Sequence, residues 1–352
     1  MRIRIRRSRL PLTEPYRLSF ATLTALDSFF ICLDVDGRIG FGEVTPLPGY
    51  SDESPDSVAA ELSRVAVSLA RGDPLGPIID ALSHQAPFVA SALACALETA
   101  REGPERAFLA PVDAAIPVVG LCGGDTPAAA AAAAARLIAD GYRVLKLKVG
   151  GAPVAADLAR VRAVATALDV GARLRLDANQ SLDYESALAL ANGVRDLPVA
   201  LLEQPFAPPR WDDFARLAAV VPVPLMLDES IAGAADIAHA AAAGAKLVKL
   251  KLCKHPGMAA TVDLIGVARA HGLEVVFGNG VQAALGNHLE ARVHAAAGLA
   301  TAAEINGFLK LAHHPLGCRM TVSGGRLSAG GLDPAALAEI AGTVVAEMAF
   351  NK

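Results

Sequence analysis

The sequence lacks paired cysteine spacings, long uncharged apolar runs and a large excess of charge of either sign. Its five cysteines, at positions 32, 95, 122, 253 and 318, are scattered, which argues against a disulfide framework and fits a cytoplasmic chain with reduced thiols. The formal net charge is −4, with no basic patch that would bind nucleic acid and no acidic tail.

The apolar segments do not predict a membrane protein. The alanine-rich run from Ala128 to Ala135 is a good helix former and is closely followed by Arg136 and Asp140, so we do not interpret it as a membrane span. From Met1 to Arg7, arginine alternates with isoleucine and no apolar run follows, which predicts a strand with one apolar face rather than a signal peptide. We therefore expect a cytoplasmic protein that does not bind membranes.

The chain does contain a regular succession of short apolar segments, each ending in a charged residue. The segments end at Lys148, Asp177, Glu203 and Asp228, which are 25 to 29 residues apart, and alanine- and leucine-rich stretches separate them. A strand and a helix repeated at this period predict successive βα units of a parallel barrel. In such barrels the catalytic groups lie at the carboxyl ends of the strands, where these charges fall.

The whole chain of 352 residues accommodates this barrel and a smaller second domain. We assign residues 1–115 to an α+β domain, because a turn at Asp36-Gly37 joins two strand-like runs, 28–35 and 39–44, and because 56–71 and 89–102 have helical apolar spacing. Residues 116–317 form the predicted barrel. Its remaining strands are expected at 116–121, 246–252, 273–277 and 302–305. We expect residues 318–352 to complete the first domain, with a strand at 319–322 and a final helix from Pro334 to Ala349.

Three carboxylates at the ends of consecutive predicted strands point to a metal. Asp177, Glu203 and Asp228 would converge on one arc of the barrel mouth and would repel one another strongly if uncompensated. A hard divalent cation resolves this repulsion, and Mg²⁺ favours oxygen ligands with positions left for water or substrate. The alternative is that these acids are unrelated and pair with nearby lysines.

Two predicted strands carry lysines on their inward faces. Lys146 and Lys148 are two residues apart, so both face the same way, while the leucines between them face the helix layer. Lys249 and Lys251 repeat the pattern on the sixth strand. Neighbouring ammonium groups lower each other's pKa, which suits a general base near neutral pH. A lysine at a solvated strand end is the alternative for each one.

The second and sixth strands of an eight-stranded barrel lie opposite each other, with the carboxylate arc between them. A substrate held at that arc would have one lysine on each face. This arrangement suits removal of a proton from the carbon beside a carboxylate, with a metal-stabilised enediolate. One lysine would take the proton, and the other would return a proton or stabilise charge.

Several motifs resemble those of the enolase superfamily, and the lysine pattern is similar to that of its muconate-lactonising-enzyme subgroup. The resemblance covers nearly the whole chain and also includes Gly42-Glu43-Val44-Thr45-Pro46. It implies a modified (β/α)₇β barrel with an α+β capping domain and one Mg²⁺ per active site, for which Mn²⁺ could substitute. The motifs are Lys146-Leu147-Lys148, Asp177-Ala178-Asn179, Glu203-Gln204-Pro205, Asp228-Glu229-Ser230 and Lys251-Leu252-Cys253-Lys254.

The resemblance also implies a role for each matching residue. Asp177, Glu203 and Asp228 would be the metal ligands. Lys148 and Lys251 would be the acid/base pair, with Lys146 assisting Lys148. Residues that support these groups or bind substrate would be Asn179, Glu229, Lys254, Asn279, Glu304 and Asn306, and loops of the capping domain near Phe20 and Tyr50 would close over the substrate.

The reaction and the substrate stay open at this point. Members of the subgroup isomerise muconate, epimerise dipeptides, racemise N-substituted amino acids or form o-succinylbenzoate by elimination. Family dipeptide epimerases carry Asp-x-Asp on the last strand to hold an ammonium, whereas this chain has Glu304-Ile305-Asn306. Lys249 replaces the usual asparagine, and His255-Pro256 departs from the usual Lys-x-Gly-Gly. We expect a homo-oligomeric isomerase that acts on a small-molecule carboxylate, with a dehydratase as the alternative.

Two alternative hypotheses assign the chain to other functional classes. A lysine on the sixth barrel strand also suits a Schiff-base aldolase, but that chemistry leaves the three carboxylates unexplained. A non-catalytic ligand-binding barrel would be expected to lose one of the five key groups, and all five are present.

Overall fold

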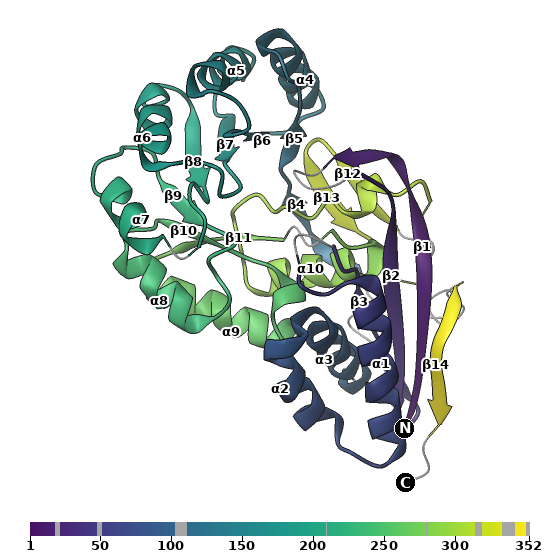
Figure 1. Ribbon diagram of the computed structural model, residues 1–352. Helices are drawn as coiled ribbons and strands as arrows, with labels where there is room; N and C mark the ends of the chain where they lie inside the picture. Colours follow the sequence, from purple (N-terminus) through teal and green to yellow (C-terminus); the bar gives the residue numbers. More distant parts are fainter. Residues whose placement is uncertain are drawn as a thin grey trace.

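An antiparallel sheet and a curled parallel sheet form the two main parts of the molecule (Figure 1). The computed structural model describes residues 1–17, 22–47, 51–102, 111–208, 210–278, 281–313, 319–332 and 342–349. The parallel sheet and its helices fill one side of the view, and the long strands of the antiparallel sheet stand on the other. No helix in these described ranges is both long and apolar enough to cross a membrane.

The antiparallel sheet joins the first strands of the chain to the last one. Its order is β14-β1-β2-β3, and the bounds are β1 (Arg2–Arg17), β2 (Thr22–Val35), β3 (Arg38–Val44) and β14 (Thr343–Ala349). The predicted hairpin is confirmed, because Val35 pairs with Arg38 across Asp36 and Gly37. Both turn residues have positive φ, 54° and 81°, as the favoured two-residue hairpin turn requires.

Three helices cover this sheet: α1 (Pro55–Ala70), α2 (Leu75–Gln85) and α3 (Pro87–Arg101). Ser54 caps α1 by accepting a hydrogen bond from the Ser57 backbone N–H, and Pro55 follows at the first helical position. Apolar residues of α1 and α3 share a core with Ile3, Ile5 and Phe29 of the sheet. This layer of helices on one face of an antiparallel sheet is the predicted α+β architecture.

The parallel sheet has seven described strands in the order β11-β10-β9-β8-β7-β6-β5. Bridges from Val118 to Ala303 and from Gly278 to Glu304 close its two edges at the position of the predicted eighth strand. The fold predicted from the sequence, a (β/α)₇β-type barrel with an α+β capping domain, is confirmed. The strands are β5 (Gly120–Cys122), β6 (Val144–Lys148), β7 (Arg173–Asp177), β8 (Val199–Glu203), β9 (Leu225–Leu227), β10 (Leu247–Leu250) and β11 (Glu274–Phe277).

Helices alternate with these strands and surround the barrel (Figure 1). Leu145 and Leu147 of β6 lie in the core that also contains Val161 and Val164 of the following helix, so they face outward and Lys146 faces inward, as predicted. The helices are α4 (Pro127–Ala139), α5 (Val154–Thr166), α6 (Tyr184–Gly193), α7 (Trp211–Ala218), α8 (Ala234–Ala242), α9 (Gly257–Ala270) and α10 (Ala284–Ala296), with short 3₁₀ turns at η2 (Leu252–Lys254) and η3 (Phe308–Lys310).

Two sequence expectations differ from the structure. The predicted first barrel strand, 116–121, is split, because β4 (Val112–Pro117) pairs with β13 (Arg326–Ala329), which in turn pairs with β12 (Met320–Ser323), while β5 alone enters the barrel. The predicted final helix is wrong for residues 343–349, which form β14 along the edge of β1. The pairing of β14 with β1 outweighs the helical propensity of its alanines.

Candidate active site

The carboxyl ends of the parallel strands bring the predicted carboxylates to one edge of the barrel, which we call the mouth. In the strand register, Lys148 pairs with Asp177, and Asp177 pairs with Glu203. Glu203 in turn pairs with Met226, two residues before Asp228. All three carboxylate side chains are buried, and Glu203 is completely inaccessible to solvent. Parallel pairing therefore places three buried acids on adjacent strands.

The backbone directly after two of these acids is strained. Asn179, Gln180 and Gln204 have φ values of 40°, 69° and 36°, a region that residues other than glycine rarely adopt. Strain of this kind persists only where surrounding contacts hold it, and it concentrates at functional sites. Here the Gln204 amide oxygen accepts hydrogen bonds from the Asp228 and Ser230 backbone N–H groups at 2.9 and 3.3 Å. Gln204 thereby ties the end of β8 to the end of β9.

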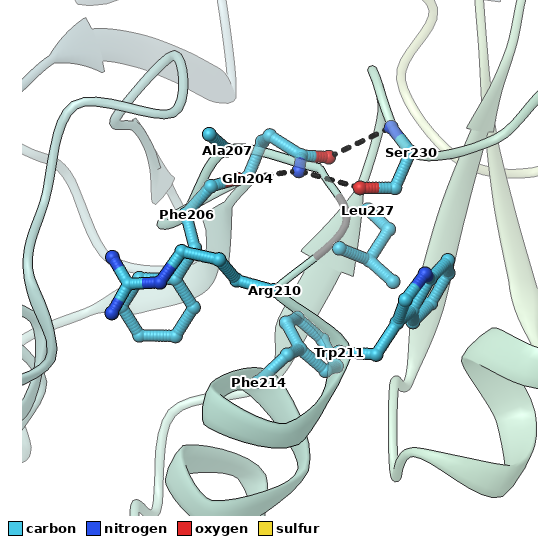
Figure 2. Close-up of a pocket in the computed structure, with 8 residues that line it drawn as sticks. All are labelled: Gln204, Phe206, Ala207, Arg210, Trp211, Phe214, Leu227 and Ser230. Carbon is cyan, nitrogen blue, oxygen red and sulfur yellow. Dashed lines mark hydrogen bonds between the residues drawn. The ribbon is translucent and has the colours of Figure 1, made fainter.

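A small pocket lies beside this tie (Figure 2). The Gln204 amide nitrogen donates to the Ser230 hydroxyl at 2.8 Å, and the Arg210 guanidinium stacks over the Phe206 ring at 4.8 Å. Its other walls are apolar, including Phe214 and Leu227. None of the residues that line the pocket is a carboxylate or lysine predicted to act on substrate.

The Lys146 ammonium contacts three carboxylates of the site. Its Nζ lies 2.8 Å from Asp177 Oδ2, 2.8 Å from Glu203 Oε2 and 3.1 Å from Glu304 Oε2. Burial alone lowers the pKa of Lys146, but the three carboxylates outweigh this effect and raise its pKa well above its usual range. The expectation that the paired lysines lower each other's pKa is therefore wrong for Lys146, which stays protonated beside its acidic partners.

Lys249 and Lys251 engage the same acids from β10 and the residue after it. Lys249 Nζ lies 2.5 Å from Glu203 Oε1 and 2.9 Å from Glu304 Oε1. Lys251 Nζ lies 2.7 Å from Asp228 Oδ1. Burial raises the pKa of Asp228, but Lys251 and Lys249 outweigh that effect and hold it well below its usual range. Each of the three carboxylates predicted to bind the metal therefore has at least one ammonium group at ion-pair distance.

The flanking residues predicted to support the site lie close to it. The Asn179 backbone N–H donates to Asp177 Oδ1 at 2.9 Å, and its side-chain amide donates to Glu229 Oε1 at 3.3 Å. Burial, together with Asp228, raises the pKa of Glu229. Burial and the nearby Lys251 lower the pKa of Lys254.

The residues near the last barrel position have partners that the sequence did not indicate. Glu304 contacts Lys146 and Lys249 and lies 3.9 Å from Arg175 Nη1. Burial raises the pKa of Glu304, but these cations lower it to about 2. Asn306 Oδ1 accepts a hydrogen bond from Lys310 Nζ at 2.8 Å.

Other predicted residues are placed differently or lie outside the described ranges. Lys148 is exposed at the end of β6, whereas Lys146 on the same strand is buried. Phe20, Tyr50 and Asn279 lie outside the described residues. Arg175 was missed, although its alternation with Leu174 and Leu176 is the signal that placed Lys146 inside the barrel.

The donor set fits a hard divalent cation in its chemistry. The three acids supply only oxygen ligands, and Glu203 Oε2 and Asp228 Oδ1 are buried and accept no hydrogen bond of good geometry, although ammonium groups lie near both. Among the residues that the structure describes, however, no three acidic, histidine or cysteine side chains converge as they would around an ion. Lys146 and Lys249 bridge the acids instead.

Comparison with known proteins agrees with this geometry. The family model described as "Enolase C-terminal domain-like" matches residues 128–331, and the one described as "MenC, N-terminal domain" matches residues 1–100. An aromatic dipeptide epimerase from Herpetosiphon aurantiacus is 30% identical over 95% of this chain and 94% of its own. A muconate cycloisomerase from Acinetobacter lwoffii is 29% identical over 81% and 78%, respectively.

A solved structure extends the likeness to three dimensions. The muconate lactonizing enzyme from Pseudomonas fluorescens, complexed with muconolactone, is 29% identical and superposes with a TM-score of 0.79 over 96% of this chain and 98% of its own. The matches cover both the antiparallel and the parallel parts of the fold. The chain therefore belongs to the enolase superfamily, within its muconate-lactonising-enzyme group.

Proposed function

We propose that the chain is an isomerase, a cycloisomerase or a racemase/epimerase, that moves a proton on the carbon beside a substrate carboxylate. The observation that carries this proposal is the placement of Lys148 and Lys251. Lys148 ends β6 and Lys251 follows β10, and the strands β7, β8 and β9 with their acids lie between them in the sheet. In a closed barrel, this order puts one lysine on each side of the carboxylate arc.

The two lysines divide the proton transfer between them. A neutral lysine takes a proton and a protonated lysine gives one, so each can reverse the other's step on the opposite face of the substrate carbon. Lys251 is held in place by Asp228, whereas Lys148 is free to reach over the mouth from its exposed position. Lys146 contributes fixed positive charge beside Asp177 and Glu203 and does not exchange its own proton.

Members of the enolase superfamily bind Mg²⁺, and in this chain Asp177, Glu203 and Asp228 would hold one such ion, with Mn²⁺ as a substitute. When bound, the ion supplies positive charge that stabilises negative charge developing on the substrate carboxylate. The Asn179 backbone N–H would orient Asp177, and the Asn179 side chain holds Glu229 beside it. We also infer a cytoplasmic homo-oligomer, whose mass by light scattering would be a multiple of 36.1 kDa.

Single substitutions of the two lysines test the proposal. Racemic and single-enantiomer carboxylates would be incubated with enzyme and Mg²⁺ in D₂O, and exchange of the α-proton followed by NMR. For an epimerase, Lys148→Ala should stop exchange from one enantiomer while Lys251 still exchanges the other, and Lys251→Ala should show the mirror pattern. For a cycloisomerase, one lysine should be essential and the other should change the rate without regard to enantiomer.

The same spectra distinguish the alternatives. Loss of water with a new double bond in the product would identify a dehydratase on the same scaffold. If both single variants keep near-wild-type turnover, neither lysine is the acid/base group and the proposal is wrong. A matched control is Lys246→Ala, which removes an exposed lysine at the amino end of β10 and should leave exchange unchanged.

A further inference from the structure

Lys310 stands out at the junction of the barrel and the antiparallel sheet because, among the residues that the structure describes, no carboxylate forms an ion pair with it. It ends η3, and its Nζ lies 2.8 Å from Asn306 Oδ1 and 5.2 Å from the centroid of the Tyr16 ring of β1. No Asp or Glu in the described part of the chain lies within ion-pair distance of it. A half-buried ammonium held by the side-chain and backbone oxygens of Asn306 and by one aromatic face retains capacity for an anion.

Tyr16 connects Lys310 to the catalytic groups. Burial raises the pKa of the Tyr16 hydroxyl, and Lys146, Glu304, Lys251 and Asp177 all act on it electrostatically. Glu304 likewise acts on Lys310, whose pKa burial lowers to about 8. Asn306, which holds the Lys310 ammonium, lies two residues after Glu304, and the Glu304 carboxylate contacts Lys146 and Lys249. Lys310 therefore belongs to the rim of the same mouth, on the side that the antiparallel sheet covers.

The groups in this region that would bind a cation are already engaged. Both Glu304 oxygens face ammonium groups, those of Lys146 and Lys249, at 3.1 and 2.9 Å. The Asn306 amide oxygen accepts the hydrogen bond from Lys310. A substrate ammonium brought here would meet the like charge of Lys310 and no available acid, which disfavours binding.

The mouth as a whole carries an excess of positive charge. Among described residues on the interior and carboxyl ends of strands β6 to β10, directly after them, and in 304–310, cationic side chains outnumber carboxylates by seven to five. A bound divalent cation would increase the excess. The cations are Lys146, Lys148, Arg175, Lys249, Lys251, Lys254 and Lys310, and the acids are Asp177, Glu203, Asp228, Glu229 and Glu304.

We propose that Lys310 binds a second carboxylate of the substrate, so that the enzyme acts on dianions and not on zwitterionic dipeptides. The inference rests on the proposed function, because the first carboxylate is the one beside the reacting carbon. Asn306 holds the Lys310 ammonium in position, and its amide nitrogen, free of the hydrogen bond made by the oxygen, is a further donor for the same anion. Lys310 is thus a specificity-determining residue and takes no part in proton transfer.

Binding measurements with matched ligands test the assignment without depending on turnover. N-succinyl amino acids and muconate would be compared with their distal mono-amides and with dipeptides by calorimetry on the Mg²⁺-loaded enzyme. A hydrogen-bonded ion pair predicts that at least one dianion binds about tenfold or more tightly than its mono-amide. Lys310→Gln should abolish this preference, and Lys310→Arg, which keeps the charge, should retain most of it.

The control is Lys246→Gln, which removes the same charge from the amino end of β10 and should leave the preference unchanged. Thermal unfolding of each variant would verify that the fold persists. The proposal is overturned if no dianion binds more tightly than its mono-amide, or if Lys310→Gln keeps the wild-type preference. Loss of α-proton exchange in every ligand, with the Lys310-dependent preference intact, would instead reject the proposed function.

Discussion

At the scale of single residues, Lys249 adds a positive charge to the site where the family usually has an uncharged asparagine. The resemblance implied asparagine at this position, and the structure places a fully buried ammonium between Glu203 and Glu304. A buried acid without a partner is costly, so Glu304 and Lys249 support each other. The departure was visible in the sequence, but its partner was not. Glu304 lies 55 residues away along the chain, and only barrel closure through the Gly278–Glu304 bridge brings the two together.

Glu203 is the residue at which the proposed metal site is tested most directly. It is completely buried and lies between the strands that carry Asp177 and Asp228. Glu203→Gln keeps the shape but removes one negative charge, so Mg²⁺ affinity should fall by at least about tenfold. Isothermal calorimetry measures this affinity, and circular dichroism verifies that the variant is folded.

The matched control is Glu185→Gln, which changes an exposed acid in the first turn of α6 and should leave Mg²⁺ affinity unchanged. Unchanged affinity in Glu203→Gln would remove this residue from the ligand set. Full activity of the wild-type enzyme in excess chelator would contradict the metal altogether.

At the scale of elements, carboxylates from the antiparallel part of the fold cap barrel helices. Glu98 of α3 accepts hydrogen bonds from the Met258 and Ala259 N–H groups, at 2.7 and 3.1 Å, at the start of α9. Glu43 of β3 accepts from the Ala283 and Gly286 N–H groups at the start of α10. The first N–H groups of a helix have no partner within the helix and carry its positive dipole end. These contacts therefore fasten the two parts of the fold together.

The Glu98 contact gives a stability prediction. Glu98→Ala removes both hydrogen bonds to α9 and leaves two N–H groups without their acceptor, so the free energy of unfolding should fall by about 1–2 kcal/mol. Urea unfolding followed by circular dichroism measures the change. Glu14→Ala, at an exposed position of β1, should alter stability by less than about 0.5 kcal/mol. Equal effects of the two substitutions would show that the capping contact does not stabilise the fold.

The parts of the fold that could be predicted are those specified by residues within or next to the element itself. The Thr126-Pro127 start of α4, the Asp36-Gly37 turn and the charged strand ends each lie within a few residues of the structure they specify. Leu75–Gln85 was not identified as the helix α2, and Pro117 ends β4 within the expected first strand. β14 depends on a partner at the other end of the chain, which no local pattern reveals.

At the scale of the whole molecule, the chain returns at the end to where it began. β14 pairs antiparallel with β1, from Arg2 opposite Ala349 to Arg7 opposite Thr343, and the two strands lie side by side in Figure 1. β14 therefore covers one edge of the antiparallel sheet. An uncovered edge would present unpaired backbone N–H and C=O groups to other chains.

Truncation after Gly342 tests whether the pairing of β14 with β1 stabilises the fold and prevents aggregation. Without β14, the edge of β1 is exposed, so the shortened chain should unfold at lower urea concentration and aggregate faster on warming, as followed by light scattering. A chain shortened only after Phe350, which keeps all of β14, is the control. If both chains behave like the wild type, β14 contributes nothing to stability or solubility.

The pairing of β14 with β1 also sets an order of events while the protein is being made. A ribosome releases the barrel strands long before residues 343–349, so β5 to β11 are available to associate while β1 still has one open side. Domains begin to fold during synthesis, and exposed strand edges make such intermediates prone to aggregation. The nascent chain must therefore carry its first strand unpaired on that side until residues 343–349 have been made, after every described strand of the parallel sheet.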